Sequence, residues 1–160
     1  MDNYTKAMKL SLPLLAAIVL LAAACSHKVS EKDIVGTYVN DPAHKTTNDL
    51  EQKMEMTFSA DHKFVVVTST PVNVEGSWSF DESTQKVQVT PVNIDIKNPQ
   101  TGQETKMTMD QMKQLLQANP NASKETAEFE KISKGSFFEP MEGGKKLYEN
   151  GQPTLIKKGS

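Results

Sequence analysis

Histidines and acidic side chains are the residues of this sequence whose types could carry out acid–base or metal chemistry. His44 and His62 lie in different predicted loops, with Asp41 and Asp49 near the first and Asp61 beside the second. Metal-binding histidines are typically separated by one or three residues, and this pair is not. We therefore expect both histidines to be exposed turn residues, and we predict no metal site and no cofactor.

Two carboxylates, Glu128 and Glu130, stand at alternate positions of a predicted strand over residues 128–132. Alternate residues on one strand face are about 7 Å apart, which is near the carboxylate separation of inverting glycosidases. A solvated strand face carries the same pattern, and no Gly-x-Ser-x-Gly nucleophile elbow occurs in the chain. A hydrolase is therefore the least favoured function, and we predict that the protein is not an enzyme.

Methionines form a third group with possible chemistry, because thioether sulfurs are soft ligands that suit copper(I). They gather in two segments, which contain Met54 and Met56 in one case and Met107, Met109 and Met112 in the other. A flexible thioether also fills irregular gaps in a hydrophobic core. We favour this second interpretation and predict no copper site.

Composition excludes other classes of function. The 160 residues carry 18 basic and 20 acidic side chains, a net charge of -2, and every basic side chain is a lysine. Nucleic-acid binding needs a phosphate-neutralising surface, and bidentate recognition of phosphate or guanine uses arginine. We therefore predict no nucleic-acid partner. The single cysteine excludes an internal disulfide.

The N-terminal segment has the pattern of a secretory signal. Lys6 and Lys9 precede a run over residues 10–24 that is apolar apart from Ser11 and Pro13. A basic region, an apolar region and small residues before a cleavage site define such a signal. The run is shorter than the ~20 apolar residues of a membrane-spanning helix. We predict a signal peptide over residues 1–24, with either Met1 or Met8 as the true start.

The end of this segment, Ala22-Ala23-Ala24-Cys25, resembles the lipobox of bacterial lipoproteins. The resemblance implies cleavage before Cys25, lipidation of its sulfur and a tether over residues 25–32. Ser26 stands where the inner-membrane retention signal of the family has an aspartate, which implies an outer-membrane protein facing the periplasm. Ordinary cleavage that leaves a free Cys25 thiol, or an uncleaved short anchor, are the alternatives.

Residues 33–160 are expected to form one β-barrel domain, because most of its predicted elements alternate between apolar and polar side chains with the period of a β-strand. The clearest alternation follows Pro71, where one strand face carries Val72, Val74, Gly76, Trp78 and Phe80. Further strands are predicted over residues 34–39, 54–58, 64–68, 87–96, 135–138, 146–149 and 152–157. In the strand over residues 87–96 the apolar parity changes at Thr90-Pro91, which predicts a β-bulge.

One helix is predicted over residues 108–118, because Thr108 and Gln111 can form a capping box ahead of an apolar stripe with helical spacing. Asn150-Gly151 suits the tight turn of a final hairpin. The expected fold is mainly β: an antiparallel meander of about eight strands that closes into a small barrel, with one helix before the last strands.

Three short motifs carry a second resemblance. Gly36-Thr37-Tyr38, the hairpin from Phe58 to Phe64, and Gly76-Ser77-Trp78 resemble the opening of small lipocalin-like domains found in many bacterial lipoproteins. The resemblance covers about residues 33–96 and implies a lipocalin-like barrel. The side chains expected to point into the barrel, and so to line any ligand site, are Tyr38, Met56, Phe58, Phe64, Trp78 and Phe80.

A small barrel either fills with such side chains or leaves room for one apolar ligand. The favoured function is a membrane-anchored envelope lipoprotein whose barrel binds a small apolar molecule or lipid. Its partners would be the membrane, through the lipid on Cys25, and that ligand. A non-catalytic module for protein–protein interaction is the alternative.

Overall fold

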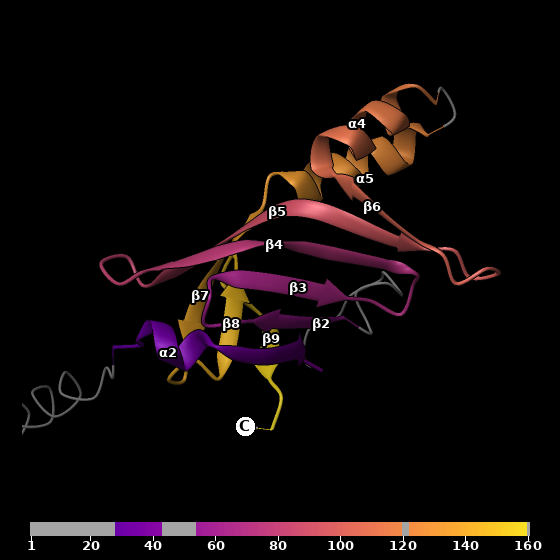
Figure 1. Ribbon diagram of the computed structural model, residues 1–160. Coiled ribbons are helices and arrows are strands. Elements are labelled where there is room, and N and C mark those ends of the chain that lie inside the picture. The colour runs from indigo at the N-terminus through magenta and orange to yellow at the C-terminus, as the bar shows by residue number, and fades with distance from the viewer. Residues whose placement is uncertain (1–27, 43–53, 120–121, 160) are drawn as a thin grey trace, which may run out of the picture.

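The computed structural model describes residues 28–42, 54–119 and 122–159 (Figure 1). Their elements are, in chain order, α2 (Glu31–Ile34), β1 (Gly36–Asn40), β2 (Glu55–Phe58), β3 (Lys63–Val67), β4 (Val72–Asp81), β5 (Lys86–Lys97), β6 (Glu104–Thr108), α4 (Met109–Gln117), α5 (Ser123–Ser133), β7 (Ser136–Met141), β8 (Lys146–Glu149) and β9 (Gln152–Lys157). Within these ranges no helix is long and apolar enough to cross a membrane.

The strands form an antiparallel barrel. Their order is β4-β3-β2-β1-β9-β8-β7-β5, and a further pairing between β4 and β5 closes the ring. The eight strands of the ring alternate in direction, and most are joined by short turns, as the alternating sequence pattern predicted. The predicted fold class, an antiparallel meander closing into a small barrel, is confirmed.

The predicted β-bulge is present in β5. Glu75 of β4 pairs with Asn93, but the next residue, Gly76, pairs with Pro91, so Val92 is the extra residue. At this point β4 and β5 lie so close that a Cβ on Gly76 would stand 2.2 Å from the carbonyl oxygen of Thr90. Glycine is therefore required at the position that the sequence motif marked.

One edge of β5 changes partner along its length. Residues 87–89 pair with β7, whereas residues 93–97 pair with β6. The segment between β6 and β7 forms the α4–α5 hairpin, which Figure 1 shows projecting beyond the barrel next to β5 and β6. The predicted helix is confirmed as α4, and its capping box forms with Gln111 N donating to Thr108 Oγ1 at 3.2 Å.

The strand predicted over residues 128–132 is wrong, because these residues belong to α5. Phe129 and Ile132 are three residues apart, which places them on one helix face, and Phe129 is buried while Ile132 is exposed. Glu128 and Glu130 therefore do not share a strand face. Strand β6 and the short helix α2 were not predicted from the sequence.

Candidate binding site in the barrel interior

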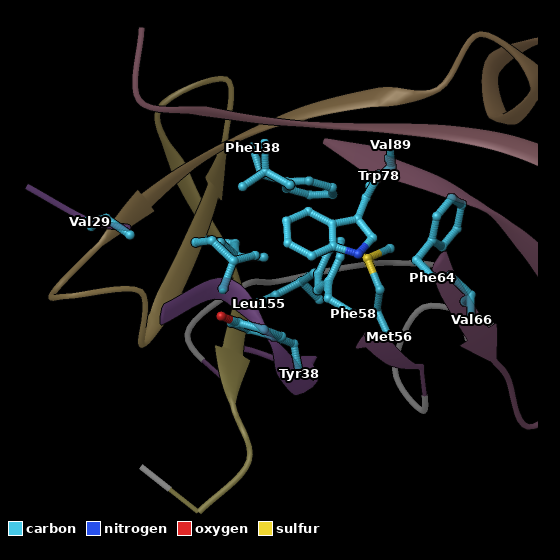
Figure 2. Close-up of a cluster of buried hydrophobic side chains, with 13 residues drawn as sticks. Val29, Tyr38, Met56, Phe58, Phe64, Val66, Trp78, Val89, Phe138 and Leu155 are labelled. Atoms are coloured by element: carbon cyan, nitrogen blue, oxygen red, sulfur yellow. The ribbon is translucent and has the colours of Figure 1, made fainter. Parts of the chain in front are cut away.

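The structure brings all six predicted interior residues into one cluster. Five of them are buried, at 0–6% exposure, and Phe80 is partly buried against them. Figure 2 shows Trp78 and Phe58 near the centre of this cluster, with Tyr38 at its lower edge. Their rings meet edge to face, with centroids 5.6 Å apart for Tyr38 and Phe58 and 5.4 Å apart for Phe58 and Trp78. Their role in ligand binding stays a prediction.

The polar atoms of the two larger aromatic side chains are already paired with backbone. The Tyr38 hydroxyl donates to the Gly144 carbonyl at 2.6 Å, and Trp78 Nε1 donates to the Ser59 carbonyl at 2.9 Å. Burial raises the pKa of the Tyr38 hydroxyl well above its ordinary value, so the hydroxyl stays a donor. These aromatic residues therefore hold the barrel together, as buried Tyr and Trp side chains with paired polar ends usually do.

Helix α2 closes one end of the barrel, which we call the α2 end. Ile34 of this helix is fully buried, and Lys157 Nζ donates to the Asp33 carbonyl at 2.7 Å. The same ammonium lies 5.7 Å from the centroid of the Tyr38 ring, and burial lowers its pKa. Gly144 also packs against the Asp33 backbone, since a Cβ there would stand 2.6 Å from the Asp33 carbonyl oxygen.

The opposite end of the barrel, which we call the distal end, is built differently. Strand pairing and alternation place its inward-facing residues, and these are only partly buried: Asn40, Met54, Val72, Val74 and Ile96. Met54 and Val74 pack against the core cluster. Ile94, between Val74 and the neighbouring strand β6, is buried. The interior is thus densely packed near α2 and more accessible toward the distal end.

Asn40 adds a polar group to these apolar walls. It follows Tyr38 by two residues on β1 and so faces the same side of the sheet. Its Nδ2 atom is buried and has no hydrogen-bond partner. An unpaired buried donor costs about 1–3 kcal/mol, and such an exception calls for an explanation. Among the described residues, the distal half of the interior therefore combines apolar side chains with the unpaired donor of Asn40.

The remaining residues singled out in the sequence lie elsewhere. Cys25, His44 and Asp49 fall outside the described residues. His62 occupies the turn between β2 and β3, with its side chain 52% exposed, and its Nε2 is 3.4 Å from Glu31 Oε1. Its ring packs against Trp78 in a tilted arrangement, with centroids 5.4 Å apart. Among the described residues no three His, Cys, Asp or Glu side chains are placed to hold a metal ion.

A charged cluster on the outer face of β4, β5 and β6 escaped the sequence analysis. Lys106 Nζ bonds the Glu75 carboxylate and lies 3.9 Å from Asp95 Oδ2. The hydrogen bond from Lys106 lowers the pKa of Glu75, whereas burial and then the Glu75 charge raise the pKa of Asp95. Because the cluster links the three strands side by side, we assign it to holding β6 on the sheet.

A cleft of about 510 Å³ lies outside the barrel, between the bulge of β5 and the α4–α5 hairpin. Its lining mixes apolar and polar side chains: Pro91, Val92, Thr108, Met109, Asp110, Lys113, Phe129 and Ser133. This cleft, too, was not predicted from the sequence. Its walls come from the bulge, from α4 with its N-cap Thr108, and from α5, where a strand was predicted over residues 128–132.

A comparison with protein-family models places most of the chain in a described family. The family model GH43_C, described as a C-terminal lipocalin-like domain, matches residues 21–137. This range holds β1 to β6, both helices of the hairpin and the start of β7. No curated protein and no solved structure matches the chain significantly.

Proposed function

Since the chain belongs to the GH43_C family of C-terminal lipocalin-like domains, we propose that it is a non-catalytic binding module whose ligand enters the barrel from the distal end. A family described as a C-terminal domain fits an accessory role better than a catalytic one. The closed barrel fits such a role too, because small barrels of this kind hold at most one small ligand.

The observation that carries this proposal is the unpaired Nδ2 of Asn40 among apolar walls. A ligand with an acceptor oxygen, such as a carbonyl or carboxylate, would pair with this donor and remove its cost. Its remaining atoms would contact Met54, Val74 and Ile96, which favour hydrocarbon. A sugar would need a partner for each of its hydroxyl groups. The ligand is therefore a small, mostly apolar molecule or lipid with an acceptor at one point.

The protein would carry out this binding in the cell envelope, anchored by acyl chains on Cys25. The support for the anchor is the lipobox resemblance at Ala22-Ala23-Ala24-Cys25 and the signal pattern before it. Each buried methylene contributes about 0.8 kcal/mol, so two or three acyl chains make the attachment stable. Ser26 after the cysteine favours the outer membrane, with the barrel facing the periplasm.

Extraction of co-purified lipid tests the binding function. The full chain is expressed in a Gram-negative host and purified in detergent, and bound apolar molecules are identified by mass spectrometry. A Val74→Trp variant should lose them, because the indole fills the distal interior. A Val67→Trp variant is the matched control, since Val67 is 47% exposed on the outer face of β3. Equal ligand recovery from both variants, or none from the wild type, would overturn the proposal.

An Asn40→Leu variant tests the role assigned to the free donor. Leucine removes an unpaired buried amide, so the ligand-free protein should become more stable by about 1 kcal/mol. The ligand with an acceptor oxygen should bind about tenfold more weakly, because it loses its hydrogen bond. Stability is measured by urea unfolding and binding by titration with the extracted ligand. Weaker binding together with lower stability would instead mean that Asn40 is a structural residue.

A protein–protein interaction module is the second candidate, favoured by exposed apolar side chains on the α4–α5 hairpin and on the strand that follows it. Leu115 on α4, Ile132 on α5 and Phe137 at the start of β7 are 58%, 51% and 56% exposed. Large apolar side chains exposed on the surface can contribute to interaction surfaces. A photo-crosslinking residue at position 115 in the intact envelope should then yield one reproducible partner, and an identical residue at Gln100 should not.

A further inference from the structure

We infer that the α2 end of the barrel rests against the membrane surface, so that the distal end faces away from the bilayer. The inference depends on the lipid anchor on Cys25 proposed above. Its own support is the way the chain is fixed to the barrel directly after that cysteine.

The chain is held to the α2 end from Val29 onward. Val29 is 7% exposed and belongs to the core cluster. Its backbone is bonded twice by one side chain, with Val29 N donating to Gln85 Oε1 at 3.0 Å and Gln85 Nε2 donating to the Val29 carbonyl at 3.3 Å. Ser30 N then donates to Asp33 Oδ2 at 2.9 Å at the start of α2. The chain is therefore fixed to the α2 end from Val29 onward.

The short distance in sequence limits how far the barrel can lie from its anchor. Three residues, Ser26 to Lys28, separate Cys25 from Val29, and four chain steps span at most about 14 Å. Strand β4 has 10 residues and runs from the distal end to the turn that contains Gln85, which is about 30 Å at ~3.3 Å per residue. The tether is therefore long enough for the α2 end to contact the lipid headgroups. It is too short for the distal end to contact them when the barrel axis is perpendicular to the membrane.

Charge does not explain this orientation, because the α2 end carries both signs. Lys28 and Lys32 are exposed, and Glu31, Asp61 and Glu142 lie on the same helix or on the turns beside it. Figure 1 shows α2 and the chain leading into it at one end of the barrel, with the β3–β4 and β5–β6 connections at the other. The short tether must set the orientation, and anionic lipid should change it little.

The orientation decides where the ligand comes from. A distal end that faces away from the bilayer receives its ligand from the aqueous side, from a soluble carrier or another protein. Direct extraction from the membrane that holds the anchor would need the opposite orientation.

Depth-dependent fluorescence quenching tests the orientation. The lipidated protein is reconstituted in phosphatidylcholine vesicles that contain a nitroxide-labelled lipid quencher. Lipidation uses the native thiol of Cys25, so one engineered cysteine is the free site for a bimane label. Exposed positions are Lys32→Cys and Lys145→Cys at the α2 end and Ser69→Cys and Gln100→Cys at the distal end. Labels at the α2 end should be quenched at least threefold more strongly than those at the distal end, with or without anionic lipid.

A longer tether is the matched control. Twenty Gly/Ser residues inserted after Ser26 add a mean reach of about 25 Å, so the difference between the two ends should shrink. With the native tether, equal quenching at both ends would mean that the barrel lies on its side. Stronger quenching at the distal end would mean the reverse orientation. Either result overturns the inference. An unmodified Cys25 in the mass spectrum and no flotation with vesicles overturn the anchor itself. Ligand recovery from the detergent-purified protein tests the binding function independently of these outcomes.

Discussion

Replacing Tyr38 by phenylalanine removes the buried hydroxyl that bonds Gly144 at the α2 end and tests how that end is held closed. Tyr38 is fully buried, and its hydroxyl donates to the Gly144 carbonyl at 2.6 Å. The ring of phenylalanine keeps the edge-to-face contact with Phe58. The change therefore isolates one buried hydrogen bond and leaves the apolar packing in place.

The size of the effect follows from two contributions. A hydrogen bond contributes a net 0.5–1.5 kcal/mol, approximately, and the Gly144 carbonyl left without its donor adds a desolvation cost. We expect the free energy of unfolding to fall by about 2 kcal/mol and the Tm by roughly 6 °C. Urea unfolding can be followed by the fluorescence of Trp78, the only tryptophan of the chain. Tyr148→Phe, on a half-buried side chain of β8, is the control and should change stability by less than about 0.5 kcal/mol.

The same variant should alter the alkaline limb of the stability profile. Burial raises the pKa of Tyr38 above its ordinary value of 10.0, so the folded protein keeps a proton that the unfolded chain releases. Stability from this group is complete below about pH 10 and is lost as the pH rises above it. The loss should be smaller in Tyr38→Phe. A change of less than about 0.5 kcal/mol at pH 7, with an unchanged alkaline limb, would refute the role assigned to this hydroxyl.

Three further changes test other parts of the fold. Gly76→Ala places a Cβ 2.2 Å from the Thr90 carbonyl oxygen. This clash should lower the free energy of unfolding by about 3 kcal/mol. A loss below about 1 kcal/mol would mean that β4 and β5 can separate at the bulge. Hydrogen bonds from Ser83 lower the pKa of Asp81 to about 2, so the stability that this turn contributes should be present above pH 4 and lost toward pH 2. The Asp81→Asn variant should therefore lose less stability than the wild type during acid unfolding. An acid-unfolding profile identical to that of the wild type would contradict this. Thr108→Ala removes the N-cap of α4 and should lower the stability of this helix by about 1 kcal/mol. Amide hydrogen exchange should then become faster in α4 alone. Faster exchange throughout the barrel would mean that the α4–α5 hairpin stabilises the ring.

The barrel was predictable because its strands repeat a clear pattern. The alternation from Val72 to Phe80 predicted which side chains of β4 face inward, and the parity change at Pro91 predicted the bulge. Helix α5 escaped prediction because its apolar content is low, so Glu128-Phe129-Glu130 resembled a strand. Local sequence decides the conformation of such a segment less than its packing does.

The candidate site was only partly predictable. Spacing along each strand correctly placed Tyr38, Phe58 and Trp78 together. The difference between the α2 end and the distal end depends on which strand ends meet and on the cap formed by Ile34. The free donor of Asn40 and the Glu75–Lys106 pair likewise depend on partners far away in the sequence. One strand at a time does not reveal these relations, because they arise from the register between strands.

Because β5 changes its partner from β7 to β6 along its length, the ring closes without the segment from β6 to α5. The ring is complete through the pairing of β5 with β7, and α4 has no buried residue. Natural insertions and deletions should therefore accumulate between Lys97 and Gly135 more readily than in any turn of the ring. For protein engineering, the same interval is the place to graft a reporter or an affinity loop onto this scaffold.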